Sequence, residues 1–244
     1  MKFSIITPSF NYGRFLKDNI ESILSQKVDF EHIIIDGGST DDTLNILKSY
    51  AHIKWVSEPD KGAADAINKG LKMATGDIVS WLNTDDFYTE GALKEVEKIF
   101  SRNYDKDVLV YGRIIFVDKD KKLINEDWEP IYELNRMIKR SADLRQPASF
   151  FTKSTLDKTG LLDINLKLVF DYDFFIRLLK IAKPIYINRF LVNFRIYNET
   201  LTNSNFRLQA WEIFKVSRKY GARFYDRINL SILIKLLMPW RFKQ

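Results

Sequence analysis

The chain of 244 residues has no cysteine, which excludes disulfide bonds and thiolate metal sites and favours a reducing compartment. It has only two histidines, His32 and His52, and we expect both at the surface or at a sheet edge rather than in a zinc site. No run of about 20 apolar residues occurs, so no transmembrane helix is expected. The first residues follow a strand pattern and show no signal-peptide pattern. These absences predict a cytoplasmic protein, and attachment to the inner face of the cell membrane stays open.

Acidic residues are scarce in one part of the chain, its C-terminal segment. Residues 206–244 hold nine Lys or Arg and two acids, a net charge of +7, while the whole chain carries +6. The preceding residues are therefore slightly acidic, with a net charge of −1. Trp, Phe and Leu are interspersed among these cations, as in helices that lie on an anionic membrane surface. Packing on the domain or on a second subunit is the alternative, so a homo-oligomer stays open. No nucleic-acid motif accompanies the charge, and we expect no nucleic-acid binding.

The first hundred residues alternate between strand and helix patterns, which predicts an α/β fold with a mostly parallel sheet covered on both faces. The expected strands are 3–8, 31–36, 53–57 and 77–82, and the expected helices are 14–26, 41–50, 63–74 and 90–100.

Farther along the chain we expect strands at 108–117, 148–152 and 185–196, helices at 156–162 and 171–181, and a loop with a short helix at 126–146. From Asn205 onward the pattern is helical. The chain therefore divides into one domain at 1–204 and a basic amphipathic helical extension at 205–244.

Two adjacent carboxylates, Asp85 and Asp86, follow the apolar strand that ends at Leu82. The carboxyl ends of parallel strands form the edge where open α/β sheets bind ligands. Carboxylate oxygens also suit Mg²⁺ or Mn²⁺ shared with a substrate diphosphate. The alternative is an ordinary turn that caps a helix beginning at Phe87–Gly91.

Several motifs in order resemble the family 2 glycosyltransferases of the GT-A fold, over about residues 1–200. They are Ile5–Asn11, Ile34–Thr43, Ser57–Gly62, Asp65–Gly70, Gly76–Asp86, Arg145–Phe151 and Asp171–Leu178. The nearest likeness is to bacterial enzymes that build capsule, exopolysaccharide or O-antigen. The resemblance implies a GT-A, Rossmann-like mixed sheet flanked by helices.

The resemblance also implies roles for individual residues in binding a nucleotide sugar. Pro8 would border the base, and Asp36 would bind the base or ribose, as would Asp60 or Lys61. Asp65 and Asn68 would lie on a helix that faces the donor. Asp86 would be the principal metal ligand, with Asp85 near the ribose, sugar or metal. Asn83 replaces one acid of the usual Asp-x-Asp motif, which leaves the division of labour between Asp85 and Asp86 open.

The same resemblance implies that Asp171 is the general base. Asp173 competes for that role, but it could cap the helix and pair with Arg177 four residues on. Tyr197 stands where the family often has histidine, and no catalytic role is assigned to it.

The implied reaction moves a sugar from a nucleotide-diphosphate sugar to a hydroxyl of a glycan or lipid-linked acceptor, with inversion at the anomeric carbon. Mn²⁺ or Mg²⁺ would be the cofactor. Two other functions are weighed: a nucleotide-sugar-binding module without catalysis, and a nucleotidyltransferase on a related fold. The second would need a glycine-rich basic loop after the first strand, which Thr7–Gly13 lacks.

Overall fold

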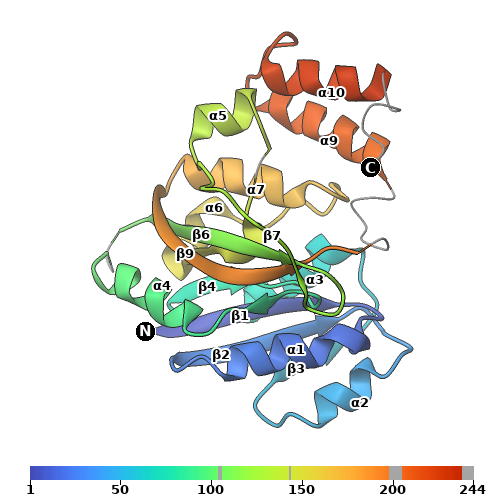
Figure 1. Cartoon of the computed structure of the whole chain (residues 1–244), viewed down its shortest axis with the longest axis vertical. Helices are drawn as coiled ribbons and strands as arrows, with labels where there is room; N and C mark the ends of the chain where they lie inside the picture. Colours follow the sequence, from blue (N-terminus) through green and yellow to red (C-terminus); the bar gives the residue numbers. More distant parts are fainter. Residues whose placement is uncertain (104–105, 143, 198–204, 238–244) are drawn as a thin grey trace.

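The computed structural model describes residues 1–103, 106–142, 144–197 and 205–237, and Figure 1 shows their arrangement. The strands are β1 (Lys2–Ser9), β2 (Asp29–Asp36), β3 (Lys54–Ser57), β4 (Ile78–Trp81), β5 (Phe87–Tyr88), β6 (Val108–Val117), β7 (Leu123–Glu126), β8 (Ser149–Thr152) and β9 (Lys183–Arg195). The helices are α1 (Gly13–Leu24), α2 (Thr43–Lys48), α3 (Ala63–Met73), α4 (Ala92–Ser101), α5 (Leu134–Lys139), α6 (Lys153–Thr159), α7 (Phe170–Leu179), α9 (Phe206–Lys219) and α10 (Arg227–Leu237).

The strands form one mixed sheet in the order β3-β2-β1-β4-β8-β6-β9-β5, with β7 paired to β6. Strands β3, β2, β1 and β4 run parallel, and β8 is antiparallel to both of its neighbours, β4 and β6. The register places Ser9, Asp36 and Ser57 side by side at the carboxyl ends of β1, β2 and β3. The polar strand ends therefore meet at one edge of the sheet.

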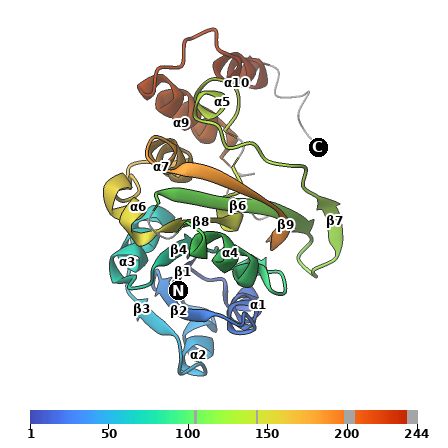
Figure 2. The same ribbon diagram turned by 90° about the vertical axis from the view of Figure 1, so that its left-hand side faces the viewer.

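Helices cover both faces of the sheet. Successive residues of a strand point to opposite faces, so neighbouring apolar residues of β1 pack against different helices. Ile5 packs with Val96 and Phe100 of α4, while Ile6 packs with Ile67 of α3 on the other side. Helices α6 and α7 lie on the same side as α3 (Figure 2). This three-layer arrangement is the predicted α/β fold, and the strands and helices of the first hundred residues lie close to the expected ranges.

Three local expectations are wrong. Phe87–Tyr88 forms strand β5 rather than a helix start, and α4 begins at Ala92 after Gly91 adopts a left-handed conformation (φ +69°). Leu123–Glu126 forms strand β7, which was not expected. His32 is fully buried rather than at an edge, because its Nε2 forms a 2.9 Å hydrogen bond with the hydroxyl of Thr7 inside the sheet.

The C-terminal helices pack on the domain rather than standing apart from it. Ala210, Val216, Ile228 and Ile232 belong to the same buried cluster as Trp81. Helix α9 packs on α7, and α10 packs on α9 and α5, as Figures 1 and 2 show. In the part of the chain that the structure describes, no helix is long and apolar enough to cross a membrane.

Candidate active site

The acidic loop after β4 is held in place by its neighbours. Thr84 donates its hydroxyl to the Pro8 carbonyl at 2.6 Å. Asn19 of α1 is fully buried, and its amide donates to the carbonyls of Asn83 and Asp86, each at 2.9 Å. These contacts join β1, α1 and the end of β4, so the two carboxylates Asp85 and Asp86 stand on a rigid support.

Asp86 is 1% exposed, and its carboxylate points into the protein. Its Oδ1 accepts from the Arg195 backbone N–H at 3.2 Å, and its buried Oδ2 has no hydrogen-bond partner among the described residues. Burial, followed by the neighbouring Asp85 charge, raises the pKa of Asp86 well above its usual range. An unpartnered carboxylate oxygen is costly to bury, so this site favours a compensating positive charge.

Asp85 is partly exposed, unlike its neighbour. Its Oδ2 accepts from the Tyr197 hydroxyl at 2.7 Å. Burial raises the pKa of Asp85, although that hydrogen bond acts in the opposite direction. The Tyr197 ring packs against Phe15 with 5.2 Å between ring centroids. Asp85 is therefore the more accessible carboxylate of the pair, whereas Asp86, the residue expected to be the principal metal ligand, is the more buried one.

Arg195 connects the acidic loop to α1. This side chain is 1% exposed, and its guanidinium donates to the Asp85 carbonyl at 2.6 Å and to the Asp18 carboxylate. It lies between the rings of Phe15 and Phe87, 4.7 and 4.8 Å from their centroids. A cation so confined stabilises the local negative charge and orients the loop.

Asp36 is fully buried at the end of β2, and its carboxylate accepts hydrogen bonds from neighbouring residues of the protein. It accepts from the Ser57 hydroxyl at 2.6 Å, from the backbone of Ser39 at 3.0 Å and of Gly38 at 3.2 Å, and from the Ser39 hydroxyl. The predicted donor-binding carboxylate thus organises the loop between β2 and α2.

Gly37 and Asp60 form the exposed part of the same corner. A Cβ atom at Gly37 would lie 2.6 Å from Asp60 Oδ2 and 3.3 Å from the ring of Phe10. Phe10 is 56% exposed and follows Pro8 along the chain. Only glycine leaves room here for the carboxylate to lie against the backbone. The structure therefore brings Phe10, Gly37 and Asp60 together, and Pro8 lies two residues before Phe10 on β1.

Helix α3 carries two further predicted donor-binding residues, with different surroundings. Asp65 accepts from the Lys61 N–H at 3.1 Å near the start of α3. Asn68 is 6% exposed, and its amide exchanges two hydrogen bonds of 2.9 Å with the backbone of Leu162. Asn68 therefore joins α3 to the segment before α7.

Asp171 lies in the first turn of α7, a helix that packs on the end of β4. The Trp81 ring at that strand end packs against Phe174 and Phe175 of α7, with centroids 5.5 and 5.9 Å apart. Asp171 Oδ1 accepts from the Tyr172 N–H at 2.7 Å. Burial raises the pKa of Asp171 to about 6. The residue as a whole is partly exposed, and a carboxylate with that pKa suits proton acceptance near neutral pH.

Asp173, the competing candidate, is engaged in ion pairs. Its carboxylate accepts from Arg177 Nε at 2.9 Å, Lys219 Nζ at 2.8 Å and the Tyr220 hydroxyl at 2.9 Å. Burial acts to raise its pKa, but these partners outweigh burial and the pKa is lowered. Asp173 is therefore an anchor between α7 and α9, and the expected pairing with Arg177 is confirmed.

Glu212 is a structural residue that sequence reasoning missed. This buried side chain of α9 accepts from the backbone N–H groups of Lys167 and Leu168 at 2.8 and 2.9 Å, just before α7. It is the only acid in a basic helix, which was the available signal. The C-terminal helix thus holds the segment that presents Asp171.

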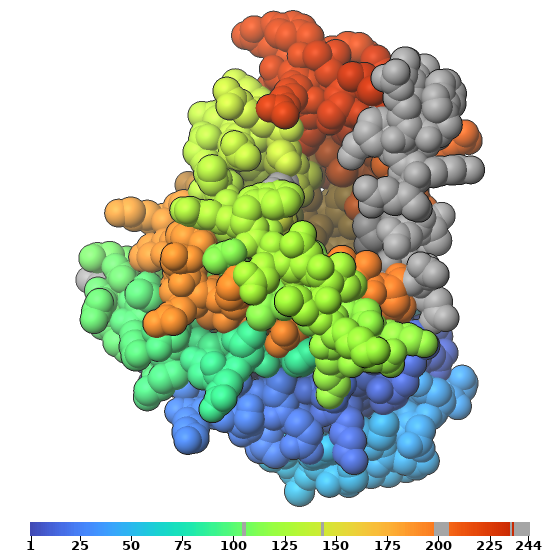
Figure 3. Space-filling view, viewed as in Figure 1, coloured from blue at the N-terminus to red at the C-terminus, as the bar shows by residue number. Residues whose placement is uncertain are grey.

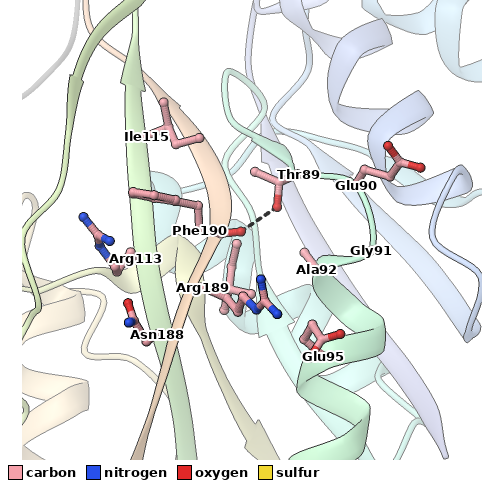
Figure 4. A pocket seen from close by; sticks show the side chains of 11 residues that line it. Thr89, Glu90, Gly91, Ala92, Glu95, Arg113, Ile115, Asn188, Arg189 and Phe190 are labelled. Carbon is pink, nitrogen blue, oxygen red and sulfur yellow. Dashed lines mark hydrogen bonds between the residues drawn. The ribbon is translucent and has the colours of Figure 1, made fainter.

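A separate cavity of about 660 Å³ lies between α4 and strands β6 and β9 (Figure 4). Glu90 and Glu95 lie on one side of it, and Arg113 and Asn188 on the other. Two residues that line the cavity are hydrogen-bonded to each other: the Thr89 hydroxyl donates to the Phe190 carbonyl at 2.7 Å. None of the predicted site residues lines this cavity.

The carboxylates of Asp85 and Asp86 could hold a divalent cation only if a bound substrate supplied further oxygen atoms. Within the described ranges, no group of three or more His, Cys, Asp or Glu side chains could hold a metal ion. The adjacent Asp85 and Asp86 offer hard oxygen donors, and both have raised pKa values that a cation would lower. This chemistry suits a metal shared with a diphosphate.

Comparison with known sequences identifies a family. The model of glycosyl transferase family 2 matches residues 4–155. A PGL/p-HBAD biosynthesis glycosyltransferase of Mycobacterium bovis is 31% identical, over 98% of this chain and 97% of its own length. The chondroitin synthase of Escherichia coli is 26% identical over 87% of this chain, which spans only 32% of that protein.

Solved structures with the same fold are more distant in sequence. S. aureus TarS 1-349 in complex with UDP-GlcNAc superposes with a TM-score of 0.70 at 18% identity, over 100% of this chain and 74% of that one. The mannosyltransferase PcManGT from Pyrobaculum calidifontis, in complex with GDP-Man and Mn²⁺, gives 0.69 at 15% identity, over 98% and 71%. These likenesses establish a GT-A architecture.

Proposed function

The chain belongs to glycosyl transferase family 2, and from this premise we propose that it is an inverting, metal-assisted enzyme. It would move a sugar from a nucleotide-diphosphate sugar to a hydroxyl of a glycan or lipid-linked acceptor. The observation that supports the proposal is the packing of the Trp81 ring, at the end of β4, on Phe174 and Phe175 of α7. The first turn of α7 carries Asp171, and the loop after β4 carries Asp85 and Asp86.

We assign metal binding to Asp85 first and to Asp86 second. Asp85 is partly exposed, whereas Asp86 is buried and bonded to the backbone of β9. A divalent cation held there would neutralise the charge that develops on the leaving diphosphate. Tyr197 and Arg195 would keep the Asp85 carboxylate and carbonyl in place, so the site needs little reorganisation when the donor binds.

The donor base would occupy the corner formed by Pro8, the Gly37 backbone and Asp60. Because the Asp36 carboxylate accepts four hydrogen bonds from its own loop and from β3, it would shape this corner rather than bind the base directly. Lys61 and Asp65 would border the donor at the start of α3. Asn68 would support this site only through its bond to Leu162.

Asp171 would accept the proton of the acceptor hydroxyl as that oxygen attacks the anomeric carbon. Its pKa of about 6 keeps it largely ionised at neutral pH and still basic enough to act. Asp173 is held by Arg177 and Lys219, so it is not free to take over this role. A single base and direct displacement give inversion.

The test is a panel of UDP- and GDP-sugars, measured by calorimetry with and without Mn²⁺. The proposal expects one donor to bind with metal-dependent affinity, and slow hydrolysis of that donor without acceptor. The transfer product should have the inverted anomeric configuration by NMR. Retention of configuration would refute direct displacement, and metal-independent donor binding would refute the role of the acidic pair.

A further inference from the structure

Helix α9 presents a row of cations and an aromatic ring to solvent. Arg207, Trp211, Lys215 and Arg218 are all exposed, Trp211 by 57%. At about 100° of rotation per residue they fall within an arc of roughly 80° around the helix. No acid lies in this arc, because Glu212 points inward to the backbone before α7.

Other aromatic and apolar side chains of the two C-terminal helices and of the turn between them are exposed as well. Trp211 stacks on Phe214 with 5.8 Å between centroids, and Phe214 meets Phe224, which is 61% exposed. On α10, Leu233 and Ile234 are 40% and 51% exposed, while Ile228 and Ile232 of the same helix are buried. The helix pair therefore has apolar side chains on both its inner and its outer surface.

Positive charge dominates the exposed surface of this helix pair. Between residues 206 and 237 there are two acids, of which Glu212 is buried and Asp226 accepts from the Arg223 N–H at 2.5 Å. Arg207, Lys215, Arg218, Arg223 and Arg227 are exposed. Such a combination of cations, Trp and Leu is typical of helices that lie in a membrane interface.

We propose that the exposed face of α9 and α10, here called the basic-aromatic face, docks on an anionic lipid bilayer. Each Lys or Arg near such a surface contributes about 1 kcal/mol of attraction, or roughly a fivefold change in binding. The exposed rings and aliphatic side chains supply the apolar contact. A second copy of the chain fits less well, because an isologous dimer would place this cationic face against itself.

Docking in this way sets the orientation of the enzyme. Helices α9 and α10 lie at one end of the molecule and α1 and α2 at the other, as Figures 1 and 2 agree and Figure 3 shows for the surface. Glu212 and Lys219 tie α9 to the segment that carries Asp171. This orientation rests on the proposed function. The end of the enzyme that lies near the general base Asp171 would face the bilayer, which holds a lipid-linked acceptor.

The experiment is co-sedimentation of the full-length protein with two kinds of vesicle. One is phosphatidylcholine alone, and the other contains phosphatidylglycerol. The protein should bind only the second, and high salt should weaken the binding. The double substitution Arg207→Gln and Lys215→Gln should lower binding about 25-fold, since two cations are removed. Trp211→Ala should weaken binding at both salt concentrations.

The matched control is Lys27→Gln with Lys48→Gln, two exposed lysines near α1 and α2 that give the same change in net charge. The control should bind like the unsubstituted protein. Equal loss in both double variants, or no binding to phosphatidylglycerol at low salt, would overturn the proposal. So would a dimer in sedimentation velocity without lipid that Trp211→Ala dissociates. Donor hydrolysis should be normal in all variants, which separates this test from that of the catalytic assignment.

Discussion

The Tyr197 hydroxyl lies 2.7 Å from Asp85 Oδ2 and joins the residues after β9 to the acidic loop after β4. The two residues are 112 positions apart in the chain. Asp85 Oδ2 accepts this bond while the side chain stays partly exposed to a ligand. We infer that Tyr197 positions Asp85 for metal binding, as neighbours of ligands do in metal sites.

Tyr197→Phe removes this hydrogen bond and keeps the ring that packs against Phe15. We expect Mn²⁺ affinity in the presence of nucleoside diphosphate to fall about 10-fold to 100-fold, with the fold unchanged. Calorimetric titration of Mn²⁺ checks this, with circular dichroism for the fold. Equal metal affinity in the variant would show that Asp85 does not need Tyr197.

Asp85→Asn and Asp86→Asn should behave differently. The first removes the partly exposed carboxylate, so Mn²⁺-dependent donor binding should be lost and turnover should fall by about two orders of magnitude or more. The second removes a buried, partly unpartnered charge, so it should raise thermal stability while reducing metal affinity less. If Asp86→Asn weakens Mn²⁺ binding more than Asp85→Asn does, our order of the two ligands is wrong.

The strand ends and the acidic loop could be predicted from the sequence because they follow from local patterns. An apolar strand followed by polar residues has a defined end, and parallel strands bring such ends together. The exposure of Asp85 relative to Asp86 could not be predicted. It depends on how one turn packs against Arg195, more than 100 residues away.

Other residues escaped prediction for the same physical reason. On an amphipathic helix, Asn68 looks like a solvent-facing or ligand-facing residue, yet its amide pairs with Leu162, 94 residues later. Glu212 looks like one acid among surface cations, yet it caps a distant loop. Periodicity reports which face of an element is apolar. It does not report which distant backbone group a polar side chain meets.

Gly37→Ala tests the corner assigned to the donor base. The new Cβ would lie 2.6 Å from Asp60 Oδ2, so the Asp60 side chain must move. We expect donor affinity to fall about tenfold, or about 1.4 kcal/mol, while the melting temperature changes little. Calorimetry with the nucleoside diphosphate measures the loss. Unchanged affinity would place the base elsewhere.

Asp171 should control the pH dependence of transfer. The base must be ionised, and its pKa is raised to about 6, so kcat should rise with pH through about 6 and level off above it. Asp171→Asn should abolish transfer and keep nucleotide binding. If the chemical step is rate-limiting and kcat is constant between pH 5 and pH 7, Asp171 is not a base with a raised pKa. An ordinary aspartate, with a pKa of about 3.9, would already be ionised throughout that range.

The raised pKa of Asp171 also predicts an effect on stability. Its folded-state pKa lies above the unfolded value, so the native state binds the extra proton between about pH 4 and 6, and stability from this group falls as pH rises through that window. Asp171→Asn removes the buried charge, and its melting temperature at pH 7 should exceed that of the parent. At about pH 4 the two proteins should melt at closer temperatures, which differential scanning calorimetry can establish.

Glu212→Ala tests whether α9 supports the base. The substitution leaves the N–H groups of Lys167 and Leu168 without their buried acceptor, so unfolding free energy should fall by about 3 kcal/mol. Because these residues precede the helix that carries Asp171, kcat should fall and the pH midpoint of kcat should move, while nucleotide affinity persists. Glu212→Gln retains one acceptor oxygen and should recover part of both losses. A variant that loses stability but keeps kcat and its pH midpoint would limit Glu212 to a structural role, since positioning of the base requires the kinetic change as well.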